Sequence, residues 1–211
     1  MELNRSCRFC DIVNGKIYYD DIDEPIAYNE EFFAIASVGA LIEGWTLIVP
    51  RMHQLSMRTT YMNPLFLNLV EKVLPSLIKK YGPIIAFEHG ANKEESITAC
   101  GTDHAHMHLV PWEGSLSKKL KNYGMKWDHC HVSEISDKAS GKEYLFYADL
   151  DRNESWGDPL GMIHVLRYPI SQFFRHVLAE HLGKQEVSDY KKYPHLGTAR
   201  QTRNVLVASV S

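Results

Sequence analysis

The sequence predicts an α+β fold, because segments with strand character surround one long helical segment. Residues 104–111 alternate histidine with apolar residues at a period of two, the period at which side chains of a β-strand share a face. Residues 63–82 place apolar residues at helical spacing between an Asn-Pro start and a Gly-Pro end. Short apolar runs on both sides of this helix have the composition of strands. We therefore expect a sheet that packs against a helix.

The other elements of the first half follow in order along the chain. Residues 26–37 predict a hairpin, and residues 44–50 predict a third strand that ends at a proline. His53 comes just past this strand, where polar site residues are common. Pro75 lies inside the predicted helix and can kink it. Residues 84–88 predict another strand, which a polar loop follows.

The character of the sequence changes after Pro111. Residues 114–125 are basic and are expected to form a solvated loop, with a short helix over the site as the alternative. Three strand-like segments precede a last helix and a polar, tyrosine-rich tail; they are residues 129–132, 144–147 and 162–166, and the helix covers 173–182. We place a boundary near residue 113, between an α+β unit, residues 1–113, and a C-terminal extension, residues 114–211, that packs on it.

The composition is that of a globular protein with one sizeable core. The 211 residues are 45% hydrophobic and 23% charged. A formal charge of −3 gives no electrostatic case for a nucleic-acid or anionic-membrane partner, and no apolar run approaches the roughly 18 residues of a membrane span. The first residues lack the apolar segment of a secretory signal, and the four cysteines are expected to be thiols or metal ligands. These observations favour a cytoplasmic enzyme or binding protein.

Chemistry is expected at His104, His106 and His108. In a strand their imidazoles share one face, while Ala105 and Met107 share the other. Imidazole is uncharged near neutral pH but easily protonated, so three of them can divide the work of attack, orientation and leaving-group assistance. Three imidazoles can also hold a catalytic zinc ion, and a histidine-rich patch without function is the third alternative.

A second motif, Cys7-Arg8-Phe9-Cys10, lies near the N-terminus. Two thiolates at this spacing can chelate one zinc ion, but they need two further ligands from elsewhere in the chain. Two ordinary thiols are the alternative. A thioredoxin-type redox role is disfavoured, because no predicted strand precedes the motif.

Together, three motifs resemble the histidine-triad (HIT) superfamily over residues 7–112: Cys7-x-x-Cys10, Ile48-Val49-Pro50-x-x-His53, and His104-x-His106-x-His108-Leu109-Val110. The resemblance implies a mainly antiparallel five-stranded sheet with a long helix, commonly paired as a homodimer. It implies a substrate that is a nucleotide or nucleotide conjugate, with hydrolysis or transfer at the α-phosphorus through a covalent nucleotidyl-imidazole. In that scheme His106 is the nucleophile, His108 contacts the phosphate and the leaving group, and His104 orients His106, partly through its main-chain carbonyl.

The resemblance also implies a structural zinc ion, since a zinc-bearing branch of the superfamily uses ligands at the positions of Cys7, Cys10, His53 and His104. Two sulfur and two nitrogen ligands close a tetrahedral shell and leave no open position for catalysis. Such an ion would hold His104 beside the nucleophile.

The substrate pocket that the resemblance implies has eight members. Phe9, Ile12 and Ile17 would line the base side, Ser37 would lie near the ribose, Thr102 near the phosphate, and the polar positions would be Glu88, His89 and Asn92. The chain departs from the family pattern at Cys100 and Gly101, where phosphate-bridging side chains are usual, and at Trp45, where histidine is common. Gln172 and Arg175 are candidates for an acceptor pocket formed by the extension. The alternative function is a non-catalytic nucleotide-binding or scaffold protein that retains the triad.

Overall fold

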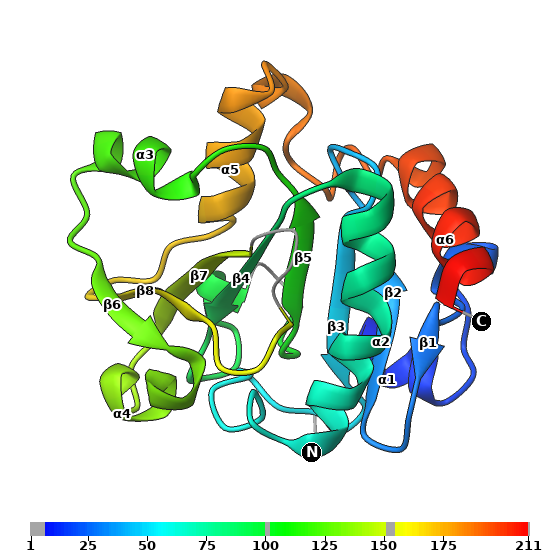
Figure 1. Cartoon of the computed structure of the whole chain (residues 1–211), viewed down its shortest axis with the longest axis horizontal. Coiled ribbons are helices and arrows are strands. Elements are labelled where there is room, and N and C mark those ends of the chain that lie inside the picture. The colour runs from blue at the N-terminus through cyan, green and yellow to red at the C-terminus, as the bar shows by residue number, and fades with distance from the viewer. Residues whose placement is uncertain (1–6, 100–101, 151–154, 211) are drawn as a thin grey trace.

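The computed structural model describes residues 7–99, 102–150 and 155–210 (Figure 1). Its strands, in chain order, are β1 Ala27–Tyr28, β2 Phe32–Ala36, β3 Thr46–Pro50, β4 Ile84–Gly90, β5 Met107–Pro111, β6 Asp128–His131, β7 Tyr144–Leu150 and β8 Leu160–Val165. Its α-helices are α1 Arg8–Val13, α2 Pro64–Tyr81, α3 Leu116–Leu120, α4 Ile135–Ala139, α5 Phe173–His181 and α6 Leu196–Val210.

One antiparallel sheet of eight strands, in the order β1-β2-β3-β5-β4-β7-β8-β6, runs through both halves of the chain. The expected number of five strands is therefore wrong. The first five in this order come from residues 27–111, and the extension supplies the other three. The reason lies at β4, whose outer edge pairs with β7 along all of Ile84–Gly90. This pairing satisfies backbone groups that a five-stranded sheet would leave at an open edge.

Both faces of the sheet are covered, so alternate residues of a strand enter different cores. Met107 and Leu109 pack on the helix face, the side that carries α2 and α6. Val110 packs on the opposite side, the pocket face, together with Phe9 of α1 and Phe174 of α5. Figure 1 shows α2 and α6 side by side on the helix face. The alternation predicted for residues 104–111 is confirmed in the packing.

Helix α2 forms for the predicted reasons. The Asn63 side chain accepts a hydrogen bond from the Leu65 amide at 2.8 Å, and Pro64 occupies the first position, where no amide donor is needed. Gly82 ends the helix with a φ of 89°. The helix runs through Pro75 as one element.

Two expectations for local structure are wrong, and one helix was not predicted. The strand at the triad begins at Met107 rather than at His104. Residues 116–120 form α3 instead of a solvated loop, because Leu116 and Leu120 lie on one side of the turn and are buried on the pocket face. The tail forms α6, which buries small and branched residues against α2 and β2. No helix of the described residues has the length and apolar character that a membrane span requires.

Candidate active site

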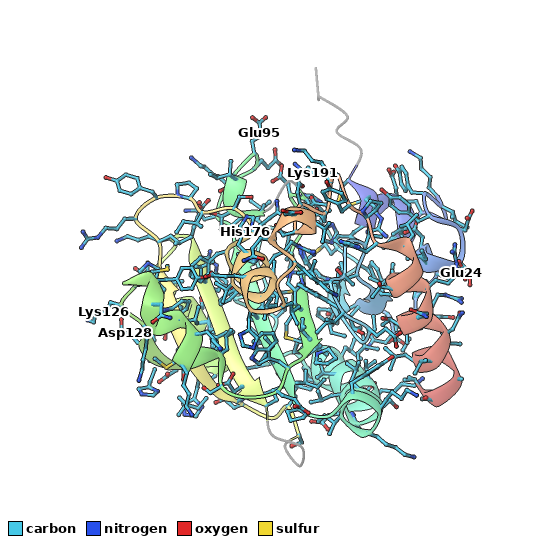
Figure 2. All side chains as sticks on the ribbon, turned by 90° about the horizontal axis from the view of Figure 1, so that it is seen from above. Glu24, Glu95, Lys126, Asp128, His176 and Lys191 are labelled. Carbon is cyan, nitrogen blue, oxygen red and sulfur yellow. The ribbon has the colours of Figure 1, made fainter. Side chains whose placement is uncertain are left out.

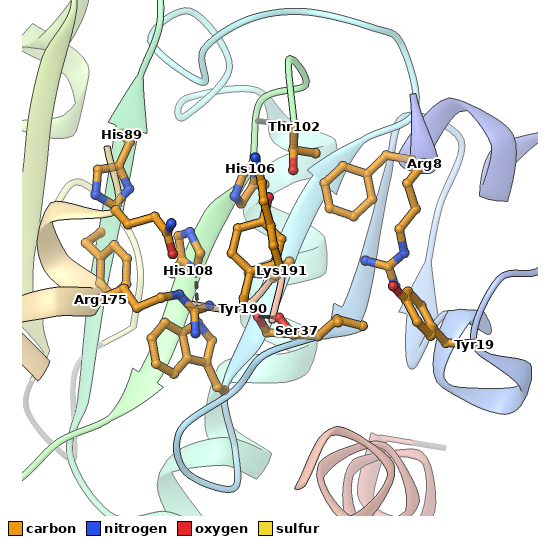
Figure 3. Close-up of a pocket in the computed structure, with 16 residues that line it drawn as sticks. Arg8, Tyr19, Ser37, His89, Thr102, His106, His108, Arg175, Tyr190 and Lys191 are labelled. Atoms are coloured by element: carbon orange, nitrogen blue, oxygen red, sulfur yellow. Dashed lines mark hydrogen bonds between the residues drawn. The ribbon is translucent and has the colours of Figure 1, made fainter. Parts of the chain in front are cut away.

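A cavity of about 300 Å³ opens on the pocket face beside the triad, a size at the lower end for small-molecule sites. Figure 3 shows His89, His108 and Arg175 on one side of it and Arg8 with Tyr19 on the other. The lining combines aromatic rings, imidazoles and cations; it consists of Arg8, Phe9, Tyr19, Ser37, Val38, Trp45, Leu47, Phe87, His89, Thr102, His106, His108, Gln172, Arg175, Tyr190 and Lys191. Among these described residues there are three cations and no carboxylate. Arg8 is ion-paired with the buried Asp23, and the positive charge of Arg175 and Lys191 suits an anionic ligand.

His106 is held with one ring nitrogen facing the backbone. Its Nδ1 lies 2.9 Å from the main-chain carbonyl oxygen of His104. A carbonyl oxygen can only accept, so Nδ1 carries the proton and Nε2 keeps its lone pair. Burial of the ring lowers the pKa of His106, although the hydrogen bond to the His104 carbonyl acts in the opposite direction. The imidazole is therefore neutral at neutral pH, with its lone pair on the nitrogen that can attack.

His108 has the opposite arrangement. Trp45 Nε1 lies 2.9 Å from His108 Nδ1, and because an indole N–H only donates, Nδ1 accepts and Nε2 carries the proton. The ring stacks on Phe87 with 4.4 Å between centroids and 16° between planes. Burial, and then electrostatic interaction with His106, His89 and Arg175, lowers the pKa of His108 well below its usual range. The His106 and His108 ring centroids are 4.8 Å apart.

His89 adds a further imidazole to the cavity wall. It lies on β4 two residues after Phe87, on the same side of the strand, and its Nε2 accepts a hydrogen bond from the Phe174 amide at 3.3 Å. Burial, followed by electrostatic interaction with His106 and Arg175, lowers the pKa of His89 to about 3. His89 is thus a neutral polar group at neutral pH.

Cys7, Cys10, His53 and His104 form a compact cluster next to the triad. Their possible ligand atoms all lie within 4.8 Å of one another. His104 Nδ1 is 3.2 Å from Cys7 Sγ and 3.5 Å from Cys10 Sγ, and His53 Nδ1 is 3.4 Å from Cys10 Sγ. Tetrahedral zinc, with bonds of about 2.3 Å to sulfur and 2.0–2.1 Å to nitrogen, places such atoms about 3.5 Å apart. The donor set and its spacing fit zinc.

The far side of the His104 ring supports the same assignment. His104 Nε2 lies 2.7 Å from the Pro50 carbonyl oxygen, so Nε2 carries the proton and Nδ1, which faces the thiols, has a free lone pair. Metal-binding imidazoles are commonly held by such a hydrogen bond on the other nitrogen. Burial lowers the pKa of His104 to about 4, which keeps the ring neutral, as a metal ligand must be.

The extension holds the loop between β2 and β3, which carries Ser37 and Trp45. Arg175 of α5 donates to the Gly39 carbonyl oxygen, and its guanidinium lies 4.6 Å from the Trp45 ring centroid. The Gly39 amide donates to the Pro194 carbonyl at 2.6 Å. Gly39 has a φ of 79°, and a Cβ there would come 2.3 Å from Tyr190 Cβ. Figure 2 shows α5 with His176, and the segment with Lys191, near the middle of the molecule in the view from above.

The structure places four of the eight residues predicted for the pocket along the cavity. These four are Phe9, Ser37, His89 and Thr102. The triad residues His106 and His108 line the same cavity, as do Gln172 and Arg175 of the extension. Ile12 is half-buried in the pocket-face core. Glu88 lies on the opposite side of β4 from His89, because successive side chains of a strand alternate.

The remaining predicted positions lie elsewhere. Ile17 is 58% exposed, and the exposed Asn92 donates to the Gly141 carbonyl at 2.8 Å. Cys100 and Gly101 lie outside the described residues.

Sequence reasoning did not assign Arg8, Tyr19, Phe87, Tyr190 or Lys191 to the cavity. Two of them had a usable signal, since Arg8 lies inside the Cys-x-x-Cys motif and Phe87 shares a strand face with His89. Tyr190 and Lys191 had none, because they belong to a polar tail whose path over the site depends on tertiary packing.

Comparisons with known proteins add the following findings. No protein-family model matches the chain. The chain is 30% identical over 107 residues to an uncharacterized HIT-like protein of Mycoplasma genitalium, an alignment that covers 50% of this chain and 72% of that protein. It is similar to the crystal structure of a HIT-like protein involved in cell-cycle regulation from Bartonella henselae (TM-score 0.39, 17% identity, 51% of this chain and 78% of that one). A hypothetical histidine triad nucleotide-binding protein from Sulfolobus tokodaii is similar as well (TM-score 0.38, 25% identity, 52% and 71%).

Proposed function

The chain belongs to the HIT-like proteins, and from this premise we propose that it is a nucleotidyl hydrolase or nucleotidyltransferase that forms a covalent nucleotidyl intermediate on His106. One observation carries the proposal. The His104 carbonyl, 2.9 Å from His106 Nδ1, leaves the lone pair on Nε2 of a ring that lines a cationic cavity.

The reaction balances with the residues at hand. His106 Nε2 attacks the α-phosphorus and forms a P–N bond, while the bond to the leaving-group oxygen breaks and its electron pair departs with that oxygen. The Nε2 proton of His108 donates a hydrogen bond to a phosphoryl oxygen and stabilises the charge that develops there. Water or another acceptor then attacks the same phosphorus, the P–N electrons return to Nε2, and the proton of an attacking hydroxyl passes to solvent.

The extension bears on the choice between hydrolysis and transfer. Gln172 and Arg175 line the same cavity as His106 and His108, which gives an acceptor or leaving group a place to bind. A transferase uses such a place to hold an acceptor, whereas a hydrolase admits water there. Product analysis with and without added phosphate or sugar-phosphate acceptors separates the two.

We also propose a structural zinc ion on Cys7, Cys10, His53 and His104. The donor set and spacing support it, and the four ligands leave no position at which the ion would touch substrate. When bound, zinc would cross-link α1 to the segment before β5 and so fix the position of His104.

Nucleotide binding without catalysis is the second candidate, and one experiment separates it from the first. The chain is incubated with a dinucleoside polyphosphate labelled at the α-phosphorus. We expect turnover and label retained on the denatured protein, and His106→Asn to reduce turnover by on the order of 10³-fold or more. His129→Asn on β6, an exposed histidine, is the matched control and should turn over normally. Tight binding with no turnover would favour the second candidate, and unchanged turnover in His106→Asn would refute the nucleophile.

The homodimer and the boundary near residue 113 remain predictions. β4 cannot pair with a second copy, because β7 occupies its outer edge along all of Ile84–Gly90. A dimer would therefore have to use another surface, such as the edge at β1 or at β6. We propose that residues 114–211 act as an extension that completes the sheet and the cavity wall of the unit formed by residues 1–113.

A further inference from the structure

Trp45 occupies a position next to the triad that its packing fixes from several sides. Its side chain is fully buried, with the Arg175 guanidinium 4.6 Å from its ring centroid and Phe87 edge-on at 5.9 Å. The preceding residue, Gly44, has a φ of 84°, and a Cβ there would meet Pro111 at 2.5 Å. These contacts hold the indole in an orientation in which Nε1 points at His108 Nδ1.

This contact sets the chemistry of His108. The indole N–H has no lone pair with which to accept, so a proton on His108 Nδ1 would face another proton across 2.9 Å. His108 consequently keeps its proton on Nε2 and resists a second one, in agreement with the lowering of its pKa by burial. If His108 gave up the Nε2 proton completely, it would become an imidazolate, since Trp45 cannot supply a replacement. His108 can donate a hydrogen bond but cannot act as a full proton donor.

The protonation state of His108 determines which leaving groups the site can release, an inference that rests on the function proposed above. We propose that Trp45 is a positioning residue that holds His108 as a hydrogen-bond donor only. The site therefore favours leaving groups that depart as stable phosphate anions over amines, which must be protonated as they leave. In the favoured reaction the P–O bond to a bridging oxygen breaks, its electron pair leaves on a phosphate, and no proton is required. With an amine leaving group the P–N bond of the substrate breaks, and the nitrogen needs a proton that no neutral His108 can release.

The charges around the cavity agree with this assignment. Arg175 is buried beside His108, Lys191 comes from the segment after α5, and both line the same cavity with no carboxylate among the described lining residues. A leaving group that carries phosphate charge gains from these cations, whereas an amine gains nothing from them. Arg175 also contacts the face of Trp45, so one residue of the extension both holds the indole and adds positive charge to the cavity.

The tautomer of His108 is measured on the full chain without substrate. Long-range ¹H–¹⁵N correlation spectra of histidine-labelled protein distinguish a protonated Nε2 from a protonated Nδ1, and His108→Gln assigns the signals. We expect His108 with the proton on Nε2 at neutral pH, and a mixture of both tautomers in Trp45→Phe. A wild-type spectrum with the proton on Nδ1, or no change of tautomer in Trp45→Phe, overturns the role of Trp45 whatever the enzyme does.

Kinetics then test the leaving group with two substrates that share a nucleoside, a dinucleoside polyphosphate and a nucleoside phosphoramidate. We expect kcat/KM to favour the polyphosphate by at least about 100-fold, the lower range of what a general acid contributes. Trp45→Phe should narrow this preference by about tenfold or more, whereas Trp156→Phe, which changes another fully buried tryptophan in the helix-face core, should leave it unchanged. Equal use of both substrates by the wild type, or an unchanged preference in Trp45→Phe, overturns the proposal. If neither substrate is turned over, the function on which this proposal rests is refuted. The spectra would still test, independently of activity, whether Trp45 fixes the tautomer of His108.

Discussion

Glu88→Ala is expected to destabilise the chain severely, because Glu88 anchors β4 from the helix face. Its carboxylate accepts hydrogen bonds from the Met57 amide at 2.6 Å, the Tyr61 hydroxyl at 2.6 Å and the Tyr144 hydroxyl. Removing the carboxylate leaves three buried donors without their acceptor, at about 1–3 kcal/mol each, or roughly 3–9 kcal/mol in total. A domain is stable by about 5–15 kcal/mol, so this loss approaches the whole.

Glu88 also gives stability a defined pH dependence. Burial raises the pKa of Glu88, although the hydrogen bonds from Met57, Tyr144 and Tyr61 lower it in part. A carboxyl with a raised pKa in the folded state binds more protons there than in the unfolded chain. Its contribution to stability is therefore fully present below the unfolded value of about 4.3 and falls as pH rises through the folded pKa. Glu88→Gln should remove this decline while it keeps the shape of the side chain.

Urea unfolding followed by circular dichroism measures both effects across pH 4 to 8, a range chosen to bracket the titration. Tyr81→Phe is the matched control, because the Tyr81 hydroxyl has no hydrogen-bond partner among the described residues, and its free energy of unfolding should stay within about 0.5 kcal/mol of the wild type. A loss below about 1 kcal/mol in Glu88→Ala would refute the anchoring role. If the free energy of unfolding of the wild type rose with pH over the range in which that of Glu88→Gln stays constant, the predicted direction of the pH dependence would be refuted.

Three further outcomes are expected. The purified chain should carry one zinc ion, as measured by mass spectrometry of the metal. Cys10→Ser should lose this ion, whereas Cys130→Ser, which changes a buried thiol outside the cluster, should keep it. Equal zinc content in both variants would contradict the site. Arg175→Met should raise KM by about tenfold, which is the lower end of the effect of losing a hydrogen bond to a charged group. Arg167→Met, which changes an exposed arginine, should leave KM unchanged. Equal KM values in the two variants would show that Arg175 does not bind substrate. Ala148→Pro, inside β7, should disturb the β4–β7 pairing and expose the edge of β4, so sedimentation should show association beyond that of the wild type; unchanged sedimentation would contradict the protective role of β7.

Local patterns predicted the first half of the fold well, since its elements carry their own signals. Asn63 and Pro64 start α2 by local hydrogen bonding, and the period of two after His104 sends Met107 to the core whatever surrounds the strand. The start of that strand was predicted three residues too early. Ala105 donates its amide to the Gln54 carbonyl at 2.6 Å instead of to a neighbouring strand, and the composition of the segment contains no sign of this contact.

The extension was harder to predict, because its role is visible only in three dimensions. The strand character of β7 is plain in the sequence, but its pairing with β4 joins residues about sixty positions apart, and no pattern in either segment specifies the partner. In the same way, Glu88 and His89 are adjacent polar residues, and both were expected in the pocket. The alternation of β4 assigns only His89 to the cavity and gives Glu88 a structural role.

His104 explains why the cysteine cluster and the triad belong to one arrangement. Its ring is held at both nitrogens, by the Pro50 carbonyl at 2.7 Å from Nε2 and by the Cys7 sulfur at 3.2 Å from Nδ1. The backbone of the next residue is held as well, through the amide of Ala105. The His104 carbonyl lies between these fixed points, and it is the group that places the proton on His106 Nδ1. A displacement at the cluster would turn this carbonyl and release the second tautomer of His106, in which Nε2 is protonated and cannot attack. Under the proposed function, the order of the cysteine cluster and the nucleophilicity of His106 are therefore coupled through one peptide group.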